Sequence, residues 1–143
     1  CCDVVVAAQS ASFIQAFSKI GLIPDSGGTF FLPRLIGWQK ASALSMLGDK
    51  VSAADAERMG MLYKVFPDEK FAEESKKRAA TLSQMPTEGL ALTKQLLNMS
   101  FHSTYEEQLQ EEDVFQQRAA MTYDYNEGIN AFLEKRQPVF KGK

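Results

Sequence analysis

Residues that bind metals or form disulfides are scarce in this sequence. Its 143 residues include two cysteines, Cys1 and Cys2, and one histidine, His102. Adjacent cysteines match neither a CxxC redox pair nor the ligand spacing of a zinc site, so we expect them to fill a buried strand. The lone histidine stands in a polar Ser-Phe-His-Ser-Thr stretch, which favours a solvated loop. The sequence therefore predicts no metal site and no disulfide framework, and the reducing cytoplasm is the simplest location.

Long apolar runs and an excess of basic residues are also missing. No apolar run approaches the roughly 18 residues of a membrane-spanning helix. Sixteen Lys and Arg against 18 Asp and Glu give a formal net charge of −2, which leaves no basic surface for nucleic acid. Gly27-Gly28 precedes a helix but lacks the lysine and the spacing of a phosphate-binding loop. The composition, 45% hydrophobic and 24% charged, is that of a soluble globular protein with a real core.

The first part of the chain carries strand and turn signals. A β-branched run over residues 3–8 predicts a strand covered on both faces, and residues 12–15 predict a second short strand. Turn-forming residues then gather over 21–29, in Gly-Leu-Ile-Pro-Asp-Ser-Gly-Gly-Thr. A later alternation over 62–66 predicts one more strand. Two or three short strands cannot form a free-standing sheet that is covered on both faces. We therefore expect further polypeptide, either upstream residues or another subunit, to complete the sheet.

After the turn cluster the pattern is mostly helical. Ser52 has the position of an N-cap, and Thr104 with Glu107 has the spacing of a capping box. Pro33 is tolerable only near the first turn of its helix. Helices are expected over residues 30–36, 41–47, 53–59, 68–82, 87–97, 105–121 and 124–135.

An ordered series of motifs carries a family resemblance. The segments are CDVVVAA (2–8), GLIPDSGGT (21–29), LPRLIG (32–37), LGDKVSAADA (47–56), GML (60–62) and EGINAFLEKR (127–136). Together they resemble the enoyl-CoA hydratase/isomerase (crotonase) family over essentially the whole chain. PDSGGT (24–29) and the closing FKGK (140–143) are most similar, within the family, to the isomerases of the phenylacetate pathway.

The resemblance implies an α/β fold. Residues 1–67 would form the last turns of the crotonase β–β–α spiral, and residues 68–143 a mostly helical region through which subunits assemble into a trimer or a dimer of trimers. The substrate would be a coenzyme A thioester, with no permanently bound cofactor. Two peptide N–H groups would stabilise a thioester enolate, and both would come from residues upstream of this chain.

The same resemblance singles out Asp25 as the catalytic acid/base. Hydratases of the family usually employ two glutamates; this chain has Phe17 in place of the second one, and Asp25 where hydratases have glycine and the isomerases have a catalytic aspartate. The expected activity is acyl-CoA isomerisation, either of a ring epoxide to an oxepin or of an enoyl-CoA double bond. A hydratase, a 4-chlorobenzoyl-CoA dehalogenase-like enzyme with Asp25 as nucleophile, and an inactive oligomerisation fragment are the alternatives. Without the family, Asp25 reads as an ordinary turn residue.

Six further residues are expected at the site. Phe17, Ile23 and Pro24 would bind the acyl group, and apolar neighbours would desolvate the Asp25 carboxylate. Phe132, Phe140 and Lys143 resemble C-terminal positions that lie near the CoA bound by an adjacent subunit; an ordinarily packed tail is the alternative.

Overall fold

The computed structural model describes residues 2–143, and its contacts divide the chain into two compact units. The N-terminal unit is Cys1–Lys76 and the C-terminal unit is Lys77–Lys143. Helix α4 (Asp68–Ser83) contains the point of division. The functional division expected at residue 67 stays a prediction.

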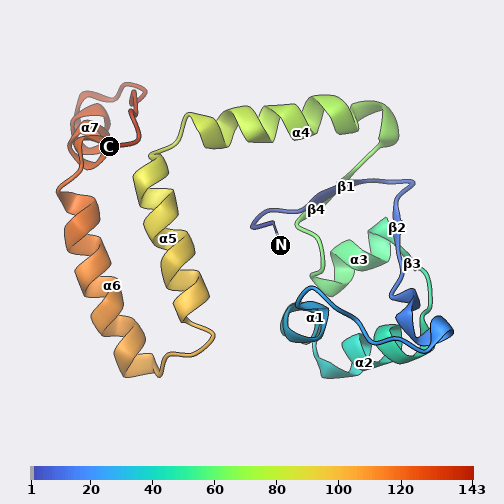
Figure 1. The fold of residues 1–143 in the computed structure, drawn as a ribbon. Coiled ribbons are helices and arrows are strands. Elements are labelled where there is room, and N and C mark those ends of the chain that lie inside the picture. Colours follow the sequence, from blue (N-terminus) through green and yellow to red (C-terminus); the bar gives the residue numbers. More distant parts are fainter. Residues whose placement is uncertain (1) are drawn as a thin grey trace. The chain divides into compact units, whose positions relative to one another are not determined.

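The N-terminal unit contains two small sheets (Figure 1). Strand β1 (Val6–Ala8) pairs in parallel with β4 (Lys64–Phe66), and β2 (Ser12–Phe13) pairs antiparallel with β3 (Val51–Ser52). The three expected strands are present but shorter, and β3 was not predicted. In β1 only Ala7 is buried, so the covering expected on both faces is not formed by the residues described here.

The interpretation of the cysteines as buried strand residues is wrong for Cys2. Cys2 is an exposed free thiol, and β1 begins only at Val6. Cys1 lies outside the described residues. The apolar pattern of residues 3–8 predicted an extended segment. Pairing with β4 determines which part of that segment is a strand.

Four helices lie between strands β2 and β4 in the sequence. They are the 3₁₀-helix η1 (Ala16–Ile20) and the α-helices α1 (Gly28–Ile36), α2 (Trp38–Leu47) and α3 (Ala53–Met59). The expected N-cap of α3 is confirmed, because the Ser52 side chain accepts the N–H of Asp55. The expectation that Pro33 lies near the first turn of its helix is wrong. Helix α1 begins at Gly28, so the proline lies inside it. The helix therefore lacks one interior hydrogen bond there.

The buried core of this unit is built largely from small residues. Ala53 and Ala56 of α3 are fully buried against Ala7, Val51 and Leu62. Alanines let α3 approach the strands closely. A neighbouring cluster consists of Leu32, Ile36 and Ala41.

The C-terminal unit is helical. After the C-terminal part of α4 come α5 (Thr87–Met99), α6 (Tyr105–Ala120) and α7 (Tyr123–Glu134), with α5 and α6 side by side (Figure 1). The capping box of α6 is confirmed: Thr104 accepts the N–H of Glu107, whose carboxylate accepts the N–H of Thr104. His102 is exposed on the turn between α5 and α6, as expected. No helix over residues 2–143 is long and apolar enough to span a bilayer.

Candidate active site

The turn that carries Asp25 connects η1 to α1. Gly21, with φ of 74°, ends η1, and the Asp25 carbonyl accepts the N–H of Gly28 at 2.8 Å. Ser26 (φ 51°) and Gly27 (φ 80°) are both left-handed. Gly27 is favoured by its dihedral angles, and a Cβ atom there would also make a tight contact of 3.1 Å with the Phe31 ring. The turn therefore holds Asp25 in a defined place directly before α1.

The expected site residues around Asp25 come together along the chain, but they do not enclose it. Asp25 is exposed, Phe17 and Pro24 are half-buried, and the Ile23 side chain is 80% exposed. Ile20 and Leu22 are exposed as well. The apolar shielding that the sequence suggested is thus not formed within the described part of the chain. An exposed carboxylate among exposed apolar side chains is a surface that a substrate or further polypeptide can cover.

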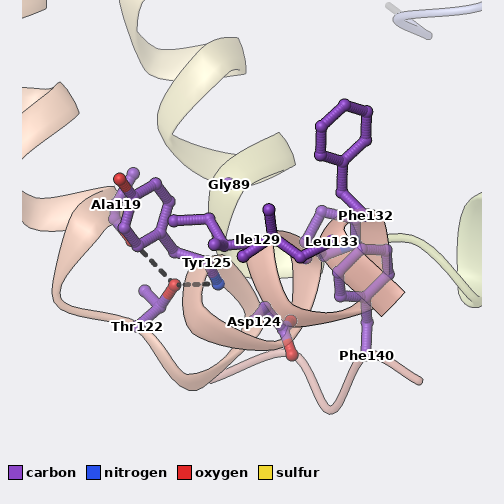
Figure 2. Close-up of a pocket in the computed structure, with 11 residues that line it drawn as sticks. Gly89, Ala119, Thr122, Asp124, Tyr125, Ile129, Phe132, Leu133 and Phe140 are labelled. Atoms are coloured by element: carbon purple, nitrogen blue, oxygen red, sulfur yellow. Dashed lines mark hydrogen bonds between the residues drawn. The ribbon is translucent and has the colours of Figure 1, made fainter. Parts of the chain in front are cut away.

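A second candidate region is an apolar pocket of about 420 Å³ in the C-terminal unit (Figure 2). It is lined by Pro86 and Gly89 near the start of α5, by residues around α7, and by Phe140. Phe132 and Phe140, both expected near CoA, line this same pocket, and Figure 2 shows the Phe132 ring projecting away from α7. Phe132 is 82% exposed, whereas Phe140 is half-buried. Lys143 is exposed, and its carbonyl accepts the N–H of Asp124 at 3.1 Å.

Beside this pocket the structure reveals two buried carboxylates that sequence reasoning missed. Asp124 is 2% exposed; its two oxygens accept the N–H groups of Lys141 (2.6 Å) and Gly142 (2.8 Å). Glu127 is 9% exposed and binds the Arg136 guanidinium through both oxygens, at 2.6 and 3.0 Å. An acid in the first turn of a helix usually indicates only a favourable helix end. The spacing of nine residues between Glu127 and Arg136 is not a helical one, so no local signal could have paired them.

The pairing of Glu127 has an electrostatic consequence. Hydrogen bonds from Arg136, and then from the Val139 N–H at 2.8 Å, lower the pKa of Glu127 to about 2. The same pair raises the pKa of Arg136. Glu127 is therefore charged at any pH near neutral, and its role is to accept hydrogen bonds rather than to transfer protons.

No group of three or more metal-ligating side chains occurs among residues 2–143. The N-terminal unit presents one exposed carboxylate on the turn before α1, and the C-terminal unit separately has an apolar pocket beside two buried carboxylates. An exposed carboxylate can exchange a proton with a bound ligand, and an apolar pocket can hold an organic group.

Comparison with known proteins identifies the family of the chain. Residues 1–143 match the enoyl-CoA hydratase/isomerase family, and the chain belongs to it. The chain is 46% identical over 141 residues to the 1,2-epoxyphenylacetyl-CoA isomerase of Escherichia coli K12, covering 99% of this chain and 54% of the relative. It is 40% identical over 141 residues to a "Probable enoyl-CoA hydratase" of Rhodobacter capsulatus, covering 99% of this chain and 55% of the relative.

Solved structures confirm the crotonase fold. The enoyl-CoA hydratase of Bacillus anthracis superposes with a TM-score of 0.94 at 32% identity, covering 99% of this chain and 55% of that one. The chain thus spans about half the length of the relatives that it matches. The described residues match about half of the crotonase fold of the Bacillus anthracis structure, with the α/β composition that the resemblance implied.

Proposed function

We propose that this chain provides the acid/base residue and part of the substrate-binding surface of an acyl-CoA isomerase. The substrate is a coenzyme A thioester, and the reaction is ring-epoxide to oxepin rearrangement, movement of an enoyl double bond, or both. The observation that carries the proposal is the single carboxylate of the loop between η1 and α1. Asp25 is the only acidic residue from residue 4 to residue 48, and Phe17 stands where a hydratase would need its second glutamate.

The chemistry follows from one carboxylate. The ionised Asp25 removes a proton from a carbon of the acyl chain, and the electron pair moves into the thioester as an enolate. The resulting carboxylic acid then returns the proton at a different carbon, so atoms and charge balance without a cofactor. Peptide N–H groups that stabilise the enolate oxygen are expected from the part of the family fold that these residues do not include. Phe17, Ile23 and Pro24 contact the acyl group in this proposal.

The remaining parts of the proposal concern binding and assembly. Phe132, Phe140 and Lys143 contribute to binding the CoA portion. The protein is a homo-oligomer, a trimer or two stacked trimers, since many large apolar side chains are exposed on the described chain, Trp38 (73%) and Met121 (84%) among them. A cytoplasmic location agrees with phenylacetate or fatty-acid degradation.

Hydration is the second candidate, supported by the 40% identity to the Rhodobacter capsulatus protein. The full-length protein should be assayed with enoyl-, dienoyl- and epoxyphenylacetyl-CoA. We expect isomerised products and no 3-hydroxyacyl-CoA. If 3-hydroxyacyl-CoA is the main product, the activity is hydration and the proposed isomerisation is wrong. If no CoA ester is turned over, both proposed activities are wrong.

A further inference from the structure

Two buried acids on α7 need an explanation. Asp124 and Glu127 are the only charged residues that are buried in the described part of the chain. Removing a carboxylate from water is costly unless its oxygens receive hydrogen bonds. Both carboxylates obtain these bonds from one place, the segment of residues 136–143, which we call the C-terminal segment.

Four residues of the C-terminal segment donate hydrogen bonds to the two carboxylates of α7, and the Lys143 carbonyl accepts the Asp124 N–H. Arg136 and Val139 donate to Glu127, and the N–H groups of Lys141 and Gly142 donate to Asp124. The segment contains no helix or strand. Its path is therefore determined by these two side chains rather than by secondary structure.

The far end of the segment also lies against α5. Gly142 is left-handed, with φ of 71°, and a Cβ atom there would collide with the Thr87 Oγ1. Between the attachment points, the Phe140 ring lies close to Gly128 of α7 and lines the apolar pocket. The attachments thus bring Phe140 to the pocket as one of its walls (Figure 2).

We propose that Asp124 and Glu127 are positioning residues that hold the C-terminal segment as a fixed wall of the apolar pocket and thereby set the affinity for the CoA ester. This inference rests on the proposed function, because it takes the ligand from there. Neither carboxylate takes part in proton transfer. Both act through Phe140 and Lys143, which the segment carries.

The isosteric variants Asp124→Asn and Glu127→Gln test this in the full-length protein. An amide has one acceptor oxygen where a carboxylate has two, so in Asp124→Asn an NH₂ group must face a backbone N–H. We expect KM for the CoA ester to rise about 10-fold while kcat stays within about 2-fold of wild type. The reason is that the lost contact stabilises the bound substrate and the transition state equally. Brief trypsin digestion, followed by mass spectrometry, should show faster cleavage after Lys141, since the scissile peptide includes the Gly142 N–H that Asp124 holds.

Glu134→Gln is the matched control. Glu134 also bonds Arg136, at 2.6 Å, but its side chain is 61% exposed, so this variant should change neither KM nor cleavage by more than about 2-fold. Gly142→Ala displaces the segment while leaving both carboxylates intact, and it should raise KM in the same way. This second variant decides the question if a carboxylate variant does not fold.

Several results would overturn the inference. These are faster cleavage with unchanged KM, raised KM with unchanged cleavage, or a fall in kcat alone. Failure of the proposed function looks different: the wild type would turn over no CoA ester. That result removes the ligand assignment, and the cleavage rates still show whether the carboxylates hold the segment.

Discussion

Replacing Asp25 by asparagine distinguishes a catalytic role of this residue from a purely structural role in the turn. In the described residues the Asp25 side chain makes no hydrogen bond or ion pair, and it is exposed. The bond that shapes the turn, from the Gly28 N–H to the Asp25 carbonyl, belongs to the backbone and survives the change. We therefore expect the free energy of unfolding to change by no more than about 0.5 kcal/mol.

The expected loss of activity is much larger. A positioned general acid/base contributes roughly 10² to 10⁴ in rate, which corresponds to about 3–5 kcal/mol of activation free energy at 1.36 kcal/mol per factor of ten. The catalytic effect would thus exceed the effect on stability at least about fivefold in free energy. Because only proton transfer is removed, kcat should fall while affinity for the CoA ester stays near that of wild type.

The assay is initial-rate kinetics of the full-length protein with its best CoA ester, alongside a thermal melting curve. Asp49→Asn, a change at another exposed aspartate of the N-terminal unit, is the matched control and should leave kcat unchanged. A normally folded Asp25→Asn protein with kcat close to wild type would refute Asp25 as the base. A stable ester on Asp25, trapped with a halogenated aromatic CoA, would point instead to the dehalogenase-like nucleophile.

Three further predictions concern the isolated residues 1–143 and the pH dependence of the fold. A preparation shown by mass spectrometry to hold only these residues should not isomerise CoA esters, because Asp25 needs an oxyanion hole from elsewhere; full-rate turnover would contradict this. The same preparation should self-associate or be poorly folded, given its exposed apolar side chains, and light scattering that finds a folded 15.9 kDa monomer at micromolar concentration would count against it. Folding lowers the pKa of Glu127 from 4.5 to about 2, so its pairing stabilises the native state above pH 4.5 and the contribution is lost as the pH falls through about 2. The difference in melting temperature between wild type and Glu127→Gln should therefore be constant near neutral pH and vanish at the acid end; a difference independent of pH would contradict the assignment.

Features encoded by neighbouring residues could be predicted from the sequence. The N-cap of α3 at Ser52 and the capping box at Thr104 need only a few adjacent positions, and both are present. The turn around Asp25 is local too, because the proline and glycines of this stretch restrict the backbone without help from the rest of the chain. The order of the motifs along the chain was sufficient to predict the family.

Features that depend on distant residues could not be predicted in this way. The pairing of β1 with β4 joins residues nearly 60 positions apart, and it determines which part of the apolar run is a strand. Pro33 lies inside α1 because the helix begins three residues after Asp25, earlier than the apolar pattern suggested. Phe17, Ile23 and Pro24 lie near Asp25 in sequence, but the described residues leave Ile23 exposed and the other two half-buried, which no local pattern indicated.

The two acids of α7 show the difference most clearly. In the sequence Asp124 and Glu127 are polar residues of an amphipathic helix, and nothing beside them indicates burial. They become buried because a segment without secondary structure returns along α7 and offers its N–H groups and Arg136 to their oxygens. Hydrogen bonding between residues 9 to 18 positions apart has no local pattern, so only the tertiary structure could decide it.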